Sequence, residues 1–240
     1  MKRGRRFKTA FILGAGLGTR LRPLTEHSPK PLLEIGGRPI ISYTMDHLIS
    51  AGVDRFIVNT HHCPEVYDEK FPEKKWRSFP IIFRHEPMLL ETAGGLKNIE
   101  DILKEDDAII CYNGDVMSDL PLHRLIETHE KKRPEATMAL RGSGGPLNVN
   151  IDQHGKIVDL RHTLGNQGVR NCLFTGIYTV ETSFLRFIET GKVESVIPVL
   201  LRRIVEEPGS ILGVIIDDGE WHDIGSIEAY EKLRTSMETQ

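Results

Sequence analysis

A short apolar run followed at once by a glycine-rich turn constrains this chain more than any other feature. Residues 9–13 (Thr-Ala-Phe-Ile-Leu) have the composition of a buried β-strand, and residues 14–18 (Gly-Ala-Gly-Leu-Gly) follow directly. Glycines in such a turn let backbone N–H groups approach an anion without Cβ collisions. The pattern favours an α/β fold with a phosphate-binding turn, and a tight turn of purely structural role is the alternative.

The turn matches neither of two common phosphate-binding motifs. The dinucleotide fingerprint GxGxxG requires a third glycine where Thr19 stands, and the Gly-Lys-Ser/Thr ending of a Walker A loop is absent. A dinucleotide-dependent oxidoreductase is therefore disfavoured, and an absence of NAD(H) binding at millimolar ligand would exclude it.

Two cations accompany the turn. Arg20 follows it directly and has the planar geometry for bidentate contact with phosphate oxygens. Lys30 stands between Pro29 and Pro31, which restrict the backbone on both sides of the cation and so preorganise it. A solvated lysine in a proline-rich loop is the alternative for Lys30, but its place beside the glycine turn favours phosphate binding.

Apolar runs alternate with helical patterns along the first half of the chain. Further strands are predicted at 55–60, 81–83 and 108–112, and helices at 39–51, 64–76, 93–103 and 121–132. Such alternation produces a mostly parallel sheet with helices on both faces, a three-layer Rossmann-like α/β fold.

From residue 136 the pattern becomes richer in strands. We expect strands at 136–141, 147–151, 157–160, 173–180 and 211–217, a hairpin turn at 152–155, and helices at 182–188, 196–206 and 227–237. No linker or repeat interrupts the chain. We therefore predict one domain over residues 1–240, with a nucleotide-binding half at about 7–135 and a smaller β-rich substrate half at about 136–240.

Composition excludes several other classes. The balance of 31 Lys and Arg against 34 Asp and Glu provides no basic field for nucleic acid. Three scattered cysteines offer neither metal-ligand spacing nor a disulfide framework, which favours a reducing cytoplasm. The N-terminal basic stretch is followed only by residues 7–13, a run that is short and interrupted by Lys8 and Thr9, so a strand explains it better than a signal peptide. No run of about 18 apolar residues occurs, so no membrane span is expected.

Two aspartates are candidates for a shared cation. Asp115, in Asn113-Gly114-Asp115, follows the fourth predicted strand at the carboxyl edge of the sheet, where open α/β folds bind ligands. Asp223 lies far along the chain in Trp-His-Asp-Ile-Gly. Carboxylates on separate loops can share one Mg²⁺ whose other positions go to phosphates and water. The alternatives are an Asx turn at Asp115 and a helix N-cap at Asp223.

The ordered motifs resemble those of the sugar-1-phosphate nucleotidyltransferases, also called nucleotide-sugar pyrophosphorylases. The resemblance rests on residues 14–21, 23–25, 29–33, 36–39, 91–95, 113–115 and 221–225, and so covers nearly the whole chain. Within that family the chain looks most like N-acetylmuramate-1-phosphate uridylyltransferases and mannose- or heptose-1-phosphate guanylyltransferases.

The resemblance implies Mg²⁺-dependent transfer of a nucleoside monophosphate from UTP or GTP to a sugar 1-phosphate, releasing pyrophosphate. It implies catalytic roles for Arg20, Lys30 and Asp115, and metal binding by Asp115 and Asp223. The implied nucleotide-binding residues are Leu13, Gly14, Ala15, Gly16, Leu17, Gly18, Thr19, Arg20, Lys30, Glu86, Thr92, Ala93, Gly94, Asn113 and Asp115. The implied sugar contacts are Asn113, Thr175, Gly176 and Glu194. A monomer or small homo-oligomer without nucleic-acid or membrane partners is expected.

The chain departs from the family at one position. Many relatives carry a lysine that binds the sugar phosphate, and Thr163 occupies that place here. Three alternatives follow: Arg161 substitutes for the lysine, the sugar phosphate is held differently, or activity is weakened. The departure keeps open a second hypothesis, a non-catalytic nucleotide-sugar-binding regulatory subunit on the same fold.

Overall fold

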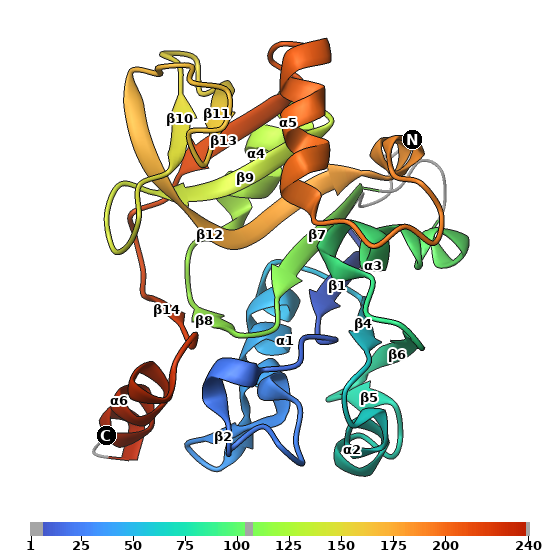
Figure 1. Ribbon diagram of the computed structural model, residues 1–240. Helices are drawn as coiled ribbons and strands as arrows, with labels where there is room; N and C mark the ends of the chain where they lie inside the picture. Colours follow the sequence, from blue (N-terminus) through green and yellow to red (C-terminus); the bar gives the residue numbers. More distant parts are fainter. Residues whose placement is uncertain (1–6, 104–107, 239–240) are drawn as a thin grey trace. The chain divides into compact units, whose positions relative to one another are not determined.

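The computed structural model describes residues 7–103 and 108–238, which form two compact units (Figure 1). Of the described residues, unit 2 contains 8–89, 112–119 and 220–238, and unit 1 contains 7, 90–103, 108–111 and 120–219. Among the described residues, no helix has both the length and the apolar character needed to span a bilayer.

Unit 2 is built on parallel strands. Strands β1 (Thr9–Leu13), β4 (Arg55–Thr60) and β6 (Phe79–His85) pair in parallel, and β5 (Lys75–Trp76) pairs antiparallel with β6. Helix α1 (Ile40–Ser50) connects β1 to β4, and α2 (Pro64–Lys70) follows β4. Apart from the partly buried Leu13, the apolar side chains of β1 and β4 are completely buried, as expected for strands covered on both faces.

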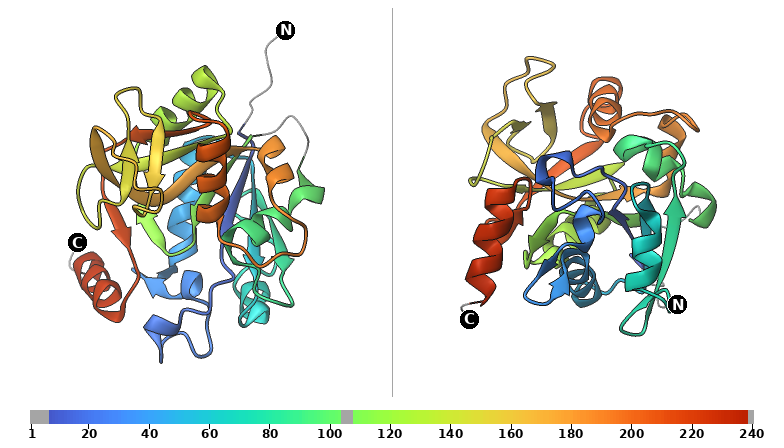
Figure 2. Two further views of the ribbon diagram at one scale, coloured as in Figure 1. Left: turned by 45° about the horizontal axis from the view of Figure 1, so that its top comes forward. Right: turned by 60° about the horizontal axis from the view of Figure 1, so that its bottom comes forward.

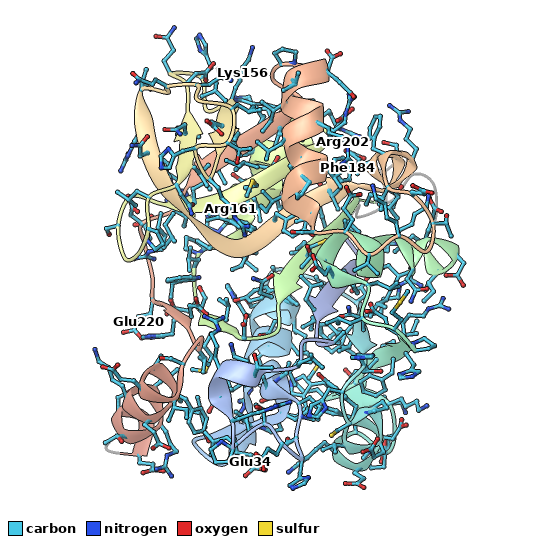
Figure 3. All side chains as sticks on the ribbon, in the orientation of Figure 1. Glu34, Lys156, Arg161, Phe184, Arg202 and Glu220 are labelled. Carbon is cyan, nitrogen blue, oxygen red and sulfur yellow. The ribbon has the colours of Figure 1, made fainter. Side chains whose placement is uncertain are left out.

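Short elements complete unit 2. They are the 3₁₀ turns η1 (Thr19–Leu21) and η2 (Lys30–Leu32), the hairpin of β2 (Glu34–Ile35) and β3 (Arg38–Pro39), strand β8 (Val116–Ser118), strand β14 (Trp221–Asp223) and helix α6 (Ile227–Glu238). Helix α6, red in Figure 2, packs Tyr230 and Leu233 into a cluster with Leu21, Leu33, Ile35, Ile40 and Ile224. The Tyr230 hydroxyl donates to the backbone carbonyl of Glu34, which Figure 3 labels.

Unit 1 is richer in antiparallel strands. Strand β12 (Arg170–Glu181) pairs antiparallel with β9 (Ala136–Arg141) and β10 (Val149–Ile151), β10 pairs antiparallel with β11 (Ile157–Leu160), and β13 (Ile211–Ile215) pairs parallel with β9. The helical elements are α3 (Glu91–Lys97), η3 (Glu100–Ile102), α4 (Leu122–Lys132), η4 (Thr182–Phe187) and α5 (Val196–Glu206). Strand β7 (Ala108–Asn113) begins in unit 1, and its last two residues belong to unit 2.

The predicted α/β fold class is confirmed, and three predicted helices differ from the structure. The helix expected at 64–76 ends at Lys70, because Pro72 disfavours a helical conformation at Phe71, and residues 75–76 form β5 instead. The helix expected at 93–103 is the shorter α3 followed by η3. The 3₁₀ turn η4 replaces the helix expected at 182–188. The division of function near residue 135 stays a prediction.

Candidate functional site

The glycine turn after β1 is fixed at its first residue. The N–H of Gly14 donates to Asn59 Oδ1 over 2.8 Å, and its carbonyl accepts from the Tyr67 hydroxyl over 3.0 Å. A Cβ at Gly14 would lie 2.6 Å from the Tyr67 oxygen and 2.7 Å from the Asn59 carbonyl oxygen. Only glycine fits here, because the neighbouring atoms are buried and held by these hydrogen bonds.

The rest of the turn presents backbone donors. Within the described part of the chain, the N–H groups of Ala15, Gly16 and Leu17 have no hydrogen-bond acceptor. Gly18 has a φ of 62°, and its carbonyl accepts from the Thr25 hydroxyl over 2.8 Å. Successive unpaired N–H groups in a glycine turn form a binding site for anionic oxygens.

Lys30 is a buried cation with one carboxylate partner. Residue Lys30 is 6% exposed, and its Nζ lies 2.7 Å from Asp115 Oδ2. The flanking prolines hold the lysine in η2, whose backbone closes through the Leu33 N–H donating to the Lys30 carbonyl. The backbone at Lys30 is therefore fixed, and the preorganisation of its amine for phosphate stays a prediction.

Pairing of β8 with β14 brings the two candidate aspartates together. These strands pair antiparallel with Asp223 opposite Val116, and the Ile224 N–H donates to the Asp115 carbonyl over 2.9 Å. Asp223 does not cap α6. Instead Ser226 Oγ accepts the N–H of Ala229 in the first turn of that helix.

The electrostatics of Asp223 reflect the neighbouring charges. Much of residue Asp223 is accessible to solvent, yet partial burial of its carboxyl group raises its pKa, and the charge of Asp115 raises it further. Lys30 and Arg20 act in the opposite direction. The Arg20 guanidinium lies close to this carboxylate, since a Cβ at Gly225 would be 3.3 Å from Asp223 Oδ1 and 3.5 Å from Arg20 Nη1.

Asp115 and Asp223 fit a divalent cation that also binds phosphate. Their mutual repulsion would be relieved by a cation between them, and carboxylate oxygens are the ligands Mg²⁺ prefers. Among the described residues no group of three or more His, Cys, Asp or Glu side chains could hold a metal by itself. A cation here would therefore take its other ligands from substrate and water, as Mg²⁺ does in phosphoryl-transfer sites.

Glu86 and Asn113 also lie in unit 2. Glu86 is fully buried, and its Oε1 accepts from Asn59 Nδ2 over 2.7 Å. Asn113 ends β7, and the next residue, Gly114, donates its N–H to the Leu13 carbonyl over 3.0 Å. The ring of His222, the residue before Asp223, contacts Glu220 Oε2.

The remaining predicted site residues belong to unit 1. The N–H groups of Ala93 and Gly94 donate to the Glu194 carbonyl, and Thr92 Oγ1 accepts the Val196 N–H. The Glu194 carboxylate pairs with Arg202, labelled in Figure 3 on α5.

Two more of these residues lie in β12. The Thr175 hydroxyl is buried and donates to the Ala139 carbonyl, and Gly176 has a φ of 81° at an irregularity between β12 and β9. Arg161 and His162, beside the exposed Thr163, have positive φ angles of 58° and 56°. The two aspartates and the glycine turn therefore share unit 2, whereas the predicted sugar contacts other than Asn113 lie in unit 1.

Sequence reasoning missed Asn59 and Tyr67, the two side chains that fix the turn. Asn59 lies near the carboxyl end of β4, opposite Leu13 in the parallel register. A buried-strand position directly after the apolar run 56–58 was the available signal for Asn59. Tyr67 gave none, since an aromatic residue in a short amphipathic helix is typical of a core position.

Comparison with known protein families shows which family the chain belongs to. The family model described as nucleotidyl transferase matches residues 9–240. The chain belongs to the nucleotidyl transferase family. The chain is 28% identical over 224 residues to the mannose-1-phosphate guanylyltransferase of Mycobacterium tuberculosis, an alignment that covers 92% of this chain and 62% of that protein. It is 32% identical over 231 residues to the mannose-1-phosphate guanyltransferase of Emericella nidulans, covering 90% of this chain and 60% of that protein. The chain thus spans about three fifths of the length of these two relatives.

Solved structures show the same fold. HddC from Yersinia pseudotuberculosis, complexed with GMP-PN, is 21% identical, with a TM-score of 0.77 over 96% of this chain and 99% of that one. The inositol-1-phosphate CTP transferase from T. maritima is 18% identical, with a TM-score of 0.79 over 98% and 97% of the two chains. This nucleotidyl transferase therefore shares its fold with HddC and with the inositol-1-phosphate CTP transferase.

Proposed function

We propose that this nucleotidyl transferase moves a nucleoside monophosphate from a nucleoside triphosphate to a sugar 1-phosphate. A phosphate oxygen of the sugar 1-phosphate attacks the α-phosphorus, a new P–O bond forms, and the bond to the β-phosphate oxygen breaks as pyrophosphate leaves. The attacking group is already an anion, so the protein supplies positioning and charge neutralisation rather than a general base.

The observation that carries this proposal is the convergence of opposite charges beside unpaired backbone donors. Lys30 lies within 2.7 Å of Asp115, Asp115 acts electrostatically on Asp223, and Arg20 lies beside Asp223. In the same unit, the turn at 14–18 offers N–H groups to phosphate oxygens. A triphosphate needs such a combination of amide donors, cations and metal-binding carboxylates.

Each group has a distinct part in the proposed reaction. The turn residues bind the triphosphate, Arg20 stabilises the charge of the departing pyrophosphate, and Lys30 neutralises the α-phosphate in the transition state. Asp115 and Asp223 would hold Mg²⁺, which when bound supplies charge neutralisation to the phosphates. The loss of one preorganised contact of this kind costs about 10²–10³ in rate.

The donor and acceptor are proposed from the relatives. Two curated relatives are described as mannose-1-phosphate guanylyltransferases, which supports GTP and mannose 1-phosphate as the first pair to test. UTP and N-acetylmuramate 1-phosphate follow from the motif resemblance. Thr163 stands where that resemblance predicts a lysine that binds the sugar phosphate. The sequence therefore constrains the identity of the sugar 1-phosphate less than that of the nucleoside triphosphate.

Pyrophosphate release tests the proposal directly. We expect release from at least one pair in a panel that combines GTP or UTP with mannose, heptose and N-acetylmuramate 1-phosphates, and only with Mg²⁺ present. If no pair releases pyrophosphate but calorimetry shows nucleotide binding, the result would favour the regulatory-subunit hypothesis. Absence of both release and nucleotide binding would contradict both hypotheses.

A further inference from the structure

A buried hydrogen-bond network underlies the glycine turn. Asn59, Tyr67 and Glu86 are at most 2% exposed, and all lie in unit 2. Asn59 accepts the Gly14 N–H with Oδ1 and donates with Nδ2 to Glu86 Oε1. Because only the NH₂ end of an amide can donate to a carboxylate, Glu86 fixes which way Asn59 faces and leaves its carbonyl oxygen toward Gly14.

Tyr67 sets the direction of the next peptide group. Its hydroxyl binds the Gly14 carbonyl over 3.0 Å, and burial raises the pKa of this hydroxyl, so it stays a donor. In a trans peptide the C=O and the following N–H point in opposite directions. The Ala15 N–H, which has no acceptor in the described chain, is therefore aimed away from Tyr67.

The same geometry extends to the candidate metal carboxylate. Because the Gly14 N–H faces Asn59, the Leu13 carbonyl faces the other way, where it accepts the Gly114 N–H over 3.0 Å. A Cβ at Gly114 would lie 2.5 Å from that carbonyl oxygen, so glycine is required for this approach. Gly114 directly precedes Asp115. A line of hydrogen bonds thus joins Glu86, Asn59 and the Leu13–Gly14 peptide to the residue before Asp115.

We propose that Asn59 and Tyr67 are positioning residues for nucleotide binding, and that Glu86 acts through Asn59 rather than by touching the nucleotide. Asn59 and Tyr67 hold both peptide groups at Gly14, so that the N–H groups that follow point toward the triphosphate. The inference rests on the proposed function, because a nucleoside triphosphate is the ligand whose binding the network would support.

A reversal of hydrogen-bond polarity tests the role of Glu86. Asn59→Asp places two carboxylates against each other in a buried site, and we expect it to weaken Mg·GTP and Mg·UTP binding about tenfold or more. Glu86→Gln should stay within about twofold of the wild type, because the new side-chain carbonyl still accepts from Asn59. The double variant Asn59→Asp/Glu86→Gln should recover most of the lost affinity, with Gln donating to Asp. Affinity is measured by calorimetry without sugar 1-phosphate, together with the unfolding temperature.

A conservative substitution tests the positioning role of Tyr67. Tyr67→Phe removes the hydroxyl and keeps the ring, whose centroid lies 5.5 Å from that of the Phe83 ring. We therefore expect about tenfold weaker nucleotide binding with a small change in unfolding temperature. Tyr43→Phe is the matched control, because its hydroxyl also donates to a backbone carbonyl in unit 2, that of Ile35. The control should bind nucleotide like the wild type.

The outcomes separate the inference from the proposed function. If the wild type binds nucleotide and both Asn59→Asp and Tyr67→Phe bind it equally well, the positioning role is wrong and the proposed function stands. If Glu86→Gln is as weak as Asn59→Asp and the double variant recovers nothing, Glu86 touches the nucleotide itself and the inference is overturned. If the wild type binds neither triphosphate, the proposed function fails first.

Discussion

Lys30 Nζ lies 2.7 Å from Asp115 Oδ2, so this buried cation is paired with a candidate metal ligand. The side chain of Lys30 is 8% exposed and that of Asp115 is 31% exposed. In the proposed reaction this amine also neutralises the α-phosphate. If Asp115 binds a metal ion as proposed, the ammonium group and that ion would compete for the same carboxylate when no nucleotide is bound.

Removal of this amine should tighten metal binding by the free protein. In Lys30→Met, Asp115 loses its neutralising partner, and we expect Mn²⁺ affinity without nucleotide to rise about threefold or more. Turnover should fall by about 10²–10³. Calorimetry or the paramagnetic resonance of free Mn²⁺ measures the first effect. Lys30→Arg, which keeps the charge, is the control, and unchanged Mn²⁺ affinity in Lys30→Met would argue against Asp115 as a ligand.

Asp223→Asn should abolish most turnover while the fold persists. The substitution removes a proposed metal ligand, and a loss of about 10²-fold or more in pyrophosphate release is expected. It also removes repulsion from Asp115, so the unfolding temperature should not fall. Asp218→Asn, at an exposed carboxylate paired with Arg124, should keep wild-type turnover. Full activity in Asp223→Asn would show that this carboxylate is dispensable.

Local patterns predicted most of the secondary structure because the strands are strongly apolar. The strands at 9–13 and 55–60 are found as predicted, and the hairpin turn at 152–155 joins β10 to β11. The β2–β3 hairpin was missed, although Gly36 and Gly37 both have positive φ angles and glycine pairs favour two-residue turns.

The grouping of the two aspartates could not be read from local patterns. Each was recognisable from its motif, but β8 and β14 are three residues long and carry no periodicity that would indicate their pairing. Their register, with Asp223 opposite Val116, joins segments far apart in the sequence. The network of Asn59 and Tyr67 was hidden for the same reason, since it depends on contacts between different elements.

Helix α6 should contribute to both stability and turnover. Leu233 packs in the cluster that contains Leu21, which follows Arg20, and Ile224, which follows Asp223. Leu233→Ala should lower the free energy of unfolding by about 2–4 kcal/mol and reduce turnover at temperatures where the variant is still folded. Urea denaturation and pyrophosphate release measure the two effects. Lys232→Ala, at the exposed neighbouring position, should change neither.

Acid should weaken the contacts of Asp46. Burial alone would raise its pKa, but hydrogen bonds from Arg77, Trp76 and Arg38 outweigh burial and hold the pKa well below its usual value. A carboxyl group with a lowered pKa stabilises the folded state above about pH 4 and loses that contribution as the pH falls. The difference in unfolding free energy between wild type and Asp46→Asn should therefore shrink from pH 6 to pH 3. A constant difference over that range would show that the charge of Asp46 contributes nothing.

Glu91 occupies a backbone conformation that suits glycine better. It is exposed and begins α3 with a φ of 60°, a left-handed conformation that costs a residue with a Cβ about 1–2 kcal/mol. Glycine removes that cost but gives the unfolded chain about 0.4–1 kcal/mol of additional entropy. Glu91→Gly should therefore raise the free energy of unfolding by about 0.5 kcal/mol, measured by urea denaturation. Glu69→Gly, at an exposed position inside α2, should lower it by about 1 kcal/mol, because that backbone is helical. Equal losses in the two variants would mean that the conformation at Glu91 carries no strain.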